Sequence, residues 1–268
     1  MKIVHAKEEA TGAAIENAFV AMEGYNTVLG ECRVMEHSCP ALLPERPHIV
    51  DIVASGTPEA LDALYGAGTA LAQLLARRSG KNSEIRIECE GVQRERLHFL
   101  GYRECDALVR MRRNHQHSPV IARLPAHCTI VFDQLADAYE ARYFIERYDA
   151  LFARGDGAAQ LKAMQAKEGF SRTVMVAPSG LAGEILVWAE DGEGVIGHLY
   201  TAPPFRRQGV ARYLLDLARR YFLDAGLQTS RMDVWQRLLP ACRAASAAGF
   251  RPAQNLKEYA AIDIDWEE

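Results

Sequence analysis

Residues 199–215, LYTAPPFRRQGVARYLL, constrain the fold of this chain more than any other stretch. An apolar strand ends at Thr201, and Pro203 and Pro204 then block further ladder hydrogen bonds and favour a turn. The polar residues that follow lead through Gly209 into a segment whose apolar residues have helical spacing. The pattern therefore predicts a strand, a proline turn and a helix in direct succession.

The start of this predicted helix has the properties of an anion-binding site. The first turn of a helix leaves main-chain amides unpaired, and the helix dipole adds about half a positive charge there. A diphosphate is a natural ligand for such a position. Gly209 and Ala211 keep large side chains away from the amides, and Arg206 and Arg207 attract anions over a longer range. The alternative is an ordinary basic helix start whose charges are solvated.

Composition narrows the class of protein. A chain of 268 residues exceeds the usual single-domain length, so we expect two domains, and 49% hydrophobic residues are enough for ordinary cores. A formal net charge of -4 and a pI near 6.1 argue against non-specific nucleic-acid binding. No apolar run is long enough to cross a membrane, and the first residues lack a signal-peptide pattern. Six scattered cysteines without CxxC spacing are typical of reduced thiols, so we expect a cytoplasmic protein without a metal site.

The N-terminal half is predicted to contain both strands and helices. A helix is expected at 13–22 and a short strand at 27–35, whereas three prolines make 38–47 irregular. Thr57 and Pro58 suit the start of a helix that continues to about Arg78. The remaining predicted elements are strands at 48–54, 84–89 and 102–111 and a helix at 91–100.

A polar segment with two prolines separates the two halves. We interpret 114–127 as a linker between a first domain at 1–113 and a second at 128–268. In the second domain, Asp133 is predicted to cap a helix that continues to about Phe152. The other predicted elements are helices at 158–168, 209–224 and 240–248 and strands at 171–177, 184–189, 194–201, 230–235 and 259–264.

The segment around the proline turn resembles motif A of the GNAT superfamily of N-acetyltransferases, V-x-P-x-x-[RQ]-x-x-G-x-[GA]. Thr201, Pro203, Arg206, Gly209 and Ala211 occupy the motif positions, and the resemblance extends over most of 128–268. It implies an α/β fold with a central mixed sheet flanked by helices, and acetyl-CoA bound between splayed parallel strands at 194–201 and 230–235. The implied contacts are Leu199, Tyr200 and Thr201 for the pantetheine arm and Arg206, Arg207, Gln208, Gly209, Val210 and Ala211 for the pyrophosphate.

The N-terminal half resembles a second, degenerate GNAT-like domain. Its ending, LGYRECDALVRM, is similar to AGFRPAQNLKEYAAI near the end of the chain. Its strand-to-helix junction at 54–58 is ASGTP, however, and lacks the arginine and glycine spacing of motif A. We therefore expect this domain not to bind CoA, but to shape the acceptor pocket or to form a dimer contact. A homodimer is compatible with this interpretation.

Acetyl transfer to an amine requires a base, because an alkyl amine is protonated at neutral pH. Many GNAT members carry a glutamate at the position of Val195. Glu193 shares the strand parity of Val195 and is our candidate catalytic base, with a solvated hairpin-edge carboxylate as the alternative. Histidine suits proton transfer near neutral pH, but strand alternation points His198 away from the face of Val195 unless a β-bulge intervenes.

Two functions from different classes remain open. The leading hypothesis is an acetyl-CoA-dependent N-acetyltransferase that transfers the acetyl group directly to a primary amine of a small molecule or peptide. The alternative is a non-catalytic acyl-CoA-binding sensor or scaffold. Val195 favours this alternative, as do Leu238 and Ala245, which stand where many relatives keep an asparagine and a tyrosine. Arg206 and Gly209 together disfavour an interaction surface without a cofactor.

Two further groups of residues have open interpretations. His115 and His117 in the predicted linker are expected to be exposed to solvent rather than to bind a metal. Tyr139, Tyr143 and Tyr148 either line an acceptor cleft or pack as an amphipathic stripe against the sheet.

Overall fold

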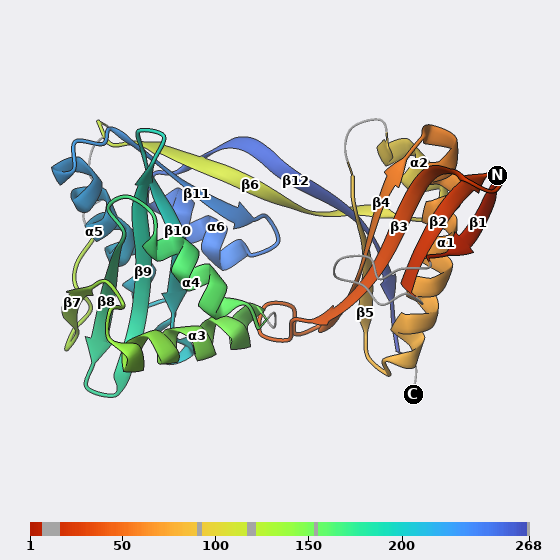
Figure 1. Ribbon diagram of the computed structural model, residues 1–268. Helices are drawn as coiled ribbons and strands as arrows, with labels where there is room; N and C mark the ends of the chain where they lie inside the picture. Colours follow the sequence, from red (N-terminus) through yellow and green to blue (C-terminus); the bar gives the residue numbers. More distant parts are fainter. Residues whose placement is uncertain (7–16, 90–92, 117–121, 153–154, 267–268) are drawn as a thin grey trace. The chain divides into compact units, whose positions relative to one another are not determined.

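The computed structural model describes residues 1–268 except 7–16, 90–92, 117–121, 153–154 and 267–268 (Figure 1). Contacts divide the chain into two units, which we describe separately. Unit 1 consists of Met1–Asp106, Ala150–Arg154 and Lys257–Glu268, and unit 2 consists of Ala107–Asp149 and Gly155–Leu256. Two strands, β6 (Arg103–Asn114) and β12 (Arg251–Ile264), contribute residues to both units.

Unit 1 is a mixed sheet packed against a long helix. Its strand order is β1–β2–β3–β4–β5–β12, in which β4 and β5 are parallel. The apolar face of α1 packs against this sheet, burying Leu64 and Ala72 in one cluster with Ile52 and Ile85. The elements are β1 (Lys2–His5), β2 (Ala18–Glu23), β3 (Thr27–Ser38), β4 (His48–Gly56), α1 (Pro58–Arg78), β5 (Ser83–Glu88) and α2 (Gln93–Phe99).

Unit 2 is built around six further strands, again of mixed direction. Its strand order is β6–β11–β10–β9–β8–β7, in which β10 and β11 are parallel. A short 3-10 turn at Pro203–Phe205 follows β10. The elements are β7 (Thr129–Asp133), α3 (Ala138–Phe152), α4 (Gly157–Gln165), β8 (Ser171–Ala177), β9 (Gly180–Glu190), β10 (Glu193–Thr201), α5 (Val210–Asp224), β11 (Thr229–Trp235) and α6 (Leu239–Ala247).

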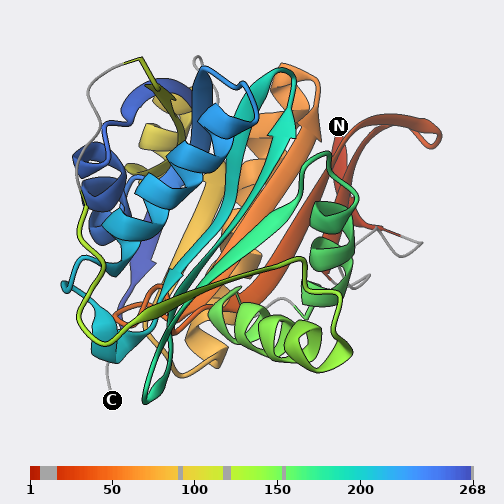
Figure 2. The same ribbon diagram turned by 90° about the vertical axis from the view of Figure 1, so that its left-hand side faces the viewer.

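Helices cover both faces of the unit 2 sheet (Figure 2). On one face, α5 and α6 bury an apolar cluster that includes Ile185, Ile196 and Leu214. On the other face, α3 and α4 bury a separate cluster that includes Phe144, Trp188 and Val195. The two faces of β9 and β10 therefore have different environments. The face on which a polar side chain of these strands lies determines which helices it contacts.

The predicted mixed α/β architecture is confirmed, and most predicted elements are present within a few residues of the expected bounds. The helix that begins at Thr57 is confirmed, since the Thr57 hydroxyl accepts a hydrogen bond from Ala60 N at 3.4 Å. None of the described helices combines the length and the apolar character needed to cross a membrane.

Two predicted helix positions are wrong. Residues 18–22 of the helix predicted at 13–22 belong to β2, because pairing with β1 and β3 on both sides outweighs their helical propensity; the earlier part lies largely outside the described residues. Asp133 ends β7 and does not cap α3. The cap is Asp137, whose side chain accepts hydrogen bonds from Tyr139 N at 2.9 Å and Glu140 N at 3.0 Å.

The units also divide the chain differently from the predicted domains at 1–113 and 128–268. Residues 107–113 of β6 belong to unit 2, where they pair with β11, and the end of β12 belongs to unit 1, where it pairs with β5. Each of these strands completes the sheet of the other half of the sequence. Such long-range strand pairing has no local sequence signal, because it depends on which strand edges are free in the folded units.

Candidate functional site

A β-bulge in β10 controls which residues face α3 and α4. Val195 pairs with Trp188 of β9 and Ile196 with Val187, but His198 pairs with Leu186, so the register shifts at Gly197. The extra residue reverses the alternation and places Val195 and His198 on the same face. Glycine is required at 197, because a Cβ there would lie 1.8 Å from the Trp188 ring. A β-bulge thus intervenes, and His198 faces the same side of the sheet as Val195.

The same region of β10 diverges from its parallel neighbour. Pairing between β10 and β11 runs only from Gly194 with Ser230 to Ile196 with Met232, although both strands are fully described and continue further. The β11-facing edge of residues 197–201 therefore has main-chain groups available for another partner. This is the splay predicted between 194–201 and 230–235, and it exposes the main chain where the pantetheine contacts of Leu199, Tyr200 and Thr201 are predicted.

The N-terminus of α5 follows the splay directly. Its N-cap, Gly209, has φ of 87° and provides no side-chain cap. The first main-chain bond at this end runs from Tyr213 N to Gly209 O at 3.0 Å, so the helix geometry leaves the amides of Val210 and Ala211 without an intrahelical acceptor. A Cβ at Gly209 would meet no atom within 4 Å, so open space lies beside these amides.

The loop before α5 presents its polar residues to solvent. Arg206, Arg207 and Gln208 are all exposed. Arg206 Nε lies 3.5 Å from the Thr201 carbonyl oxygen, and Gln208 Nε2 donates to the Pro204 carbonyl at 2.8 Å. Arg207 has a left-handed backbone with φ of 63°, which costs on the order of 1 kcal/mol for a residue other than glycine. Loop, helix terminus and splay together form an anion cradle, defined here as residues 199–211.

A group of buried charges lies beside the splay on the α3 face. Glu184 of β9 is fully buried and accepts a hydrogen bond from Arg147 Nε of α3 at 2.9 Å and another from Arg172 Nε of β8 at 2.9 Å. The guanidinium of Arg172 also contacts Asp133 at 3.1 Å and Glu140 at 3.2 Å. These side chains tie β7, β8, β9 and α3 together at one end of the sheet.

Glu184 is held in its ionised form. Burial alone would raise the pKa of Glu184, but the neighbouring His198 and the charges of Arg147 and Arg172 outweigh burial and lower that pKa to about 2. An acid this strong is a poor proton acceptor near neutral pH. The role that this carboxylate can fill is electrostatic: it is a fixed negative charge that faces Arg147, Arg172 and one further neighbour.

His198 is that neighbour. Its Nε2 lies 3.5 Å from Glu184 Oε1, too long for a well-formed hydrogen bond, and no other described residue provides a partner for this buried nitrogen. Its ring packs against Phe144 with centroids 5.3 Å apart and against Tyr148 at 5.9 Å. The residue is 7% exposed and lies on the stretch of β10 that forms the splay. Its imidazole therefore keeps hydrogen-bonding capacity next to a carboxylate.

Glu193, the predicted base, lies elsewhere. It begins β10, eight positions before Thr201, which is roughly 25 Å along an extended strand. Its carboxylate accepts hydrogen bonds from Arg112 at 3.0 Å and from the Thr229 hydroxyl at 3.1 Å. Glu193 thus has a structural partner on each oxygen and lies at the end of the strand remote from the cradle.

Two of the positions at which many GNAT members carry a polar residue, Val195 and Ala245, lie in apolar surroundings. Val195 is buried in the cluster under α3 and α4, and Ala245 of α6 is fully buried in the cluster on the opposite face. Tyr139 and Tyr143 are exposed and share a hydroxyl–hydroxyl contact of 2.7 Å, whereas Tyr148 packs on His198. The sheet-packing interpretation therefore holds for Tyr148 but not for the other two tyrosines.

Sequence reasoning missed Glu184, Arg147 and Arg172. Each has an unremarkable local context: Glu184 begins an apolar strand segment, and Arg147 lies among mixed residues of a helix. Only the pairing of β8 with β9, and the packing of α3 over both, brings the three together. A charged residue within a strand that is otherwise apolar was the one available signal.

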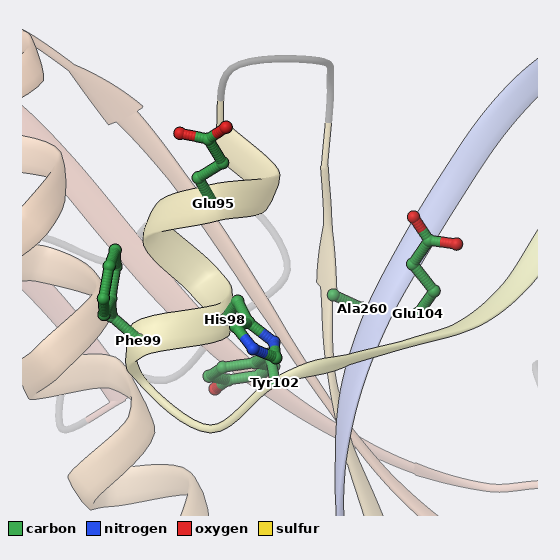
Figure 3. A pocket seen from close by; sticks show the side chains of 6 residues that line it. All are labelled: Glu95, His98, Phe99, Tyr102, Glu104 and Ala260. Atoms are coloured by element: carbon green, nitrogen blue, oxygen red, sulfur yellow. The ribbon is translucent and has the colours of Figure 1, made fainter.

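Unit 1 contains a separate hollow of about 350 Å³ (Figure 3). Its lining residues are Glu95, His98, Phe99, Tyr102, Glu104 and Ala260. The Tyr102 hydroxyl is engaged with Thr69 at 2.7 Å, and burial raises the pKa of Tyr102. None of the residues predicted for cofactor binding or catalysis lines this hollow, and we assign it no function.

Comparisons with known proteins agree with this geometry. The model of the acetyltransferase (GNAT) family matches residues 130–250. A GCN5-related N-acetyltransferase from Sphaerobacter thermophilus is similar in fold, with a TM-score of 0.57 and 15% identity over 95% of this chain and 84% of its own. A tandem GNAT protein from the clavulanic acid biosynthesis pathway has a TM-score of 0.53 and 14% identity over 92% of this chain and 82% of its own. A search of curated proteins found no significant match.

A probable N-acyltransferase from Enterococcus faecalis V583 is also similar, with a TM-score of 0.58 and 13% identity over 93% of this chain and 62% of its own. At these identities the structural matches establish the fold, which is that of tandem GNAT proteins. The family match covers the splay, the cradle and the buried charges of unit 2, and it implies an acyl-CoA donor. Residues 130–250 of this chain belong to the GNAT acetyltransferase family.

Proposed function

We propose that this protein is an acetyl-CoA-dependent N-acetyltransferase that acts on a primary amine of a small molecule or peptide. The observation that carries the proposal is the continuity of the anion cradle with the splayed edge of β10 and, on the same strand, His198 beside the ionised Glu184. A binding module needs the cradle alone. A transferase also needs a group that accepts a proton where the acyl group arrives.

The residues of the cradle fit a diphosphate followed by a pantetheine arm. The amides of Val210 and Ala211 would hold the phosphate oxygens, and the exposed Arg206 and Arg207 would add charge. Main-chain groups at Leu199–Thr201 would pair with the amide groups of the arm, since that edge has no strand partner. The bound thioester supplies an electrophilic carbonyl for attack by the amine.

We assign the base to His198 rather than Glu193. The imidazole would take the proton from the attacking amine, directly or through one water, and Glu184 would stabilise the imidazolium that forms. Arg147 and Arg172 keep Glu184 ionised and in place, so they are positioning residues. Glu184 itself is fully buried and acts only through His198.

The amine acceptor would approach over α3. Tyr139 and Tyr143 present hydroxyl groups to solvent on this helix, and Tyr200 of β10 lies 5.5 Å from the Arg147 guanidinium in a cation–π contact. These aromatic and polar groups suit a partly apolar amine. They do not by themselves distinguish a small molecule from a peptide.

Release of free thiol from acetyl-CoA in the presence of an amine panel tests the proposal. We expect amine-dependent release of thiol. In His198→Ala kcat should fall about 100-fold or more, with the Kd for CoA nearly unchanged. Glu193→Gln is the matched control and should retain activity.

The competing hypothesis is a non-catalytic acyl-CoA-binding module, which the apolar Val195 and Ala245 favour. It predicts a thermal shift with CoA but no thiol release with any amine. No thermal shift at micromolar CoA would instead reject the cradle itself.

A further inference from the structure

A second polar cluster lies in unit 2, on the α5 face of the sheet. His115 follows the end of β6 and is 5% exposed, so the expected exposure to solvent is wrong for this residue; His117 lies outside the described residues. Both ring nitrogens of His115 and the hydroxyl of Ser230, which is 1% exposed, have no hydrogen-bond partner among the described residues. Buried polar atoms in native proteins normally have partners, so these atoms indicate something bound between them.

Arg113 occupies the same cluster. It pairs with Ser230 across β6 and β11 and is 4% exposed. No hydrogen bond or ion pair to its guanidinium is found in the part of the chain that the structure describes. Its nearest charged neighbours are Arg219 and Asp216 of α5, and burial together with Arg219 lowers the pKa of Arg113. An arginine stays protonated in proteins, so this residue is a buried charge without a paired counter-charge.

Asp216 compensates that charge only in part, since its effect on the pKa of Arg113 is smaller than the opposing effects of burial and Arg219. Its two carboxylate oxygens are already engaged, one with Arg219 at 3.1 Å and the other with Arg220 at 2.7 Å. Arg113, Arg219 and Arg220 carry three positive charges against the single negative charge of Asp216. Burial and the charges of Arg113 and Arg219 lower the pKa of His115 to about 4, so its ring is neutral near pH 7 and adds a hydrogen-bond donor, not a cation.

We propose that Arg113, His115 and Ser230 bind a small oxyanion between β6, β11 and α5. The guanidinium would supply the charge and paired donors, and the imidazole and hydroxyl would each supply one hydrogen bond. Inorganic phosphate, sulfate and a small carboxylate share this chemistry. Internal water would satisfy the hydroxyl and the ring but would leave the charge of Arg113 unpaired.

This oxyanion site differs from the anion cradle in position. Ser230 pairs with Gly194 at the start of β10, whereas the cradle follows the end of that strand. Along α5, Asp216 and Arg219 lie six and nine residues beyond Val210, or about 9 and 14 Å at the helical rise. The inference therefore stands independently of the proposed transferase activity.

Thermal unfolding in phosphate tests the oxyanion site, with chloride at equal ionic strength as the reference. We expect 10 mM phosphate to raise the Tm of wild-type protein by about 3 °C or more if the Kd is near 1 mM. Arg113→Met should lose most of this response and, in chloride, should unfold at the same temperature as wild type or higher, because an unpaired buried charge has been removed. Arg243→Gln, an exposed arginine of α6, should respond like wild type.

Phosphate can also bind at the cradle, so the same titration is repeated in Gly209→Glu. A response that survives in Gly209→Glu and disappears in Arg113→Met supports the oxyanion site. A response that disappears only in Gly209→Glu overturns it. Crystals of wild-type protein soaked in selenate give a second measure: an anomalous peak at the Arg113 guanidinium supports the proposal, and ordered water alone at that position overturns it.

Discussion

In each unit a helix follows the first strand of the parallel pair. The junction between strand and helix is closed by the protein chain in unit 1 and is open to a ligand in unit 2. In unit 1, Thr57 alone connects β4 to α1: its hydroxyl caps Ala60 N, and its own amide donates to the Leu29 carbonyl at 2.9 Å. In unit 2, residues 202–209 connect β10 to α5, and the cap is a glycine without a side chain. The first junction satisfies its own amides, whereas the second leaves them for a ligand.

The parallel pairs themselves are similar. Pairing between β4 and β5 ends at Ile52, before the end of β4 at Gly56, and pairing between β10 and β11 ends at Ile196, before the end of β10 at Thr201. Main chain of β3 also packs against the unit 1 junction, since a Cβ on Gly56 would lie 2.5 Å from the Leu29 carbonyl oxygen. We therefore expect no ligand of this kind at the unit 1 junction, because a short connection brings the main chain of β3 against it.

The largest expected difference between the units concerns buried charge. Glu184→Gln leaves the Arg147 and Arg172 guanidiniums short of a counter-charge in unit 2, so we expect a loss of about 3 kcal/mol in the free energy of unfolding. The matched change in unit 1, Glu36→Gln beside His48, involves a half-exposed carboxylate and should cost less than about 1 kcal/mol. Chemical denaturation of both variants compares them, and equal losses would contradict the contrast.

The acid dependence of stability gives a second readout of Glu184. Its pKa of about 2 in the folded protein is below the value of an unfolded glutamate, so its contribution is fully present above about pH 4.5 and is lost as pH falls towards 2. The amount is on the order of 3 kcal/mol. Glu184→Gln should therefore show a flatter loss of stability over this range than wild type.

The open helix end is tested by Gly209→Glu. A carboxylate at this N-terminus would occupy the amides and repel phosphate, so we expect the Kd for CoA to rise about 100-fold or more. Isothermal titration of CoA measures this change. Gly209→Asn, which tolerates a left-handed backbone, should weaken binding much less. Unchanged binding in Gly209→Glu would show that CoA does not use this helix end.

The bulge in β10 is tested by Gly197→Ala. The added methyl group would overlap the Trp188 ring, so we expect about 2 kcal/mol of destabilisation and a loss of activity as His198 moves. The control in unit 1 is Gly66→Ala, an uncrowded position in α1, which should stabilise the protein by about 0.5–1 kcal/mol. Full activity of Gly197→Ala would argue against a role for the bulge in placing His198.

The smallest effect is expected at the closed helix end. Thr57→Ala removes the cap of α1 and should cost about 1 kcal/mol in stability. It should leave the Kd for CoA unchanged, because we expect CoA to bind only at the open helix end in unit 2. A change in CoA affinity measured by titration would contradict the assignment of donor binding to unit 2 alone.

Local sequence was enough to predict the cradle and the helix cap at Thr57. Pro203, Pro204 and Gly209 act on their own backbone, and a helix start leaves free amides whatever surrounds it. The absence of this pattern at 54–58 likewise predicted a different junction in unit 1. These features can be predicted without knowledge of the fold, because their physical causes lie within a few residues of each other in the sequence.

The tertiary structure alone decided which groups surround the cradle. The orientation of His198 depends on the β-bulge at Gly197, which packs against the Trp188 ring of the neighbouring strand. Glu184 contacts Arg172 and Arg147 only because β8 and α3 pack beside β9. Strand parity without the bulge directed His198 away from the face of Val195, because one extra residue reverses every side chain beyond it. The prediction that His115 is exposed was wrong because its burial also depends on tertiary contacts. These come from β11 and α5, which lie more than 90 residues further along the chain.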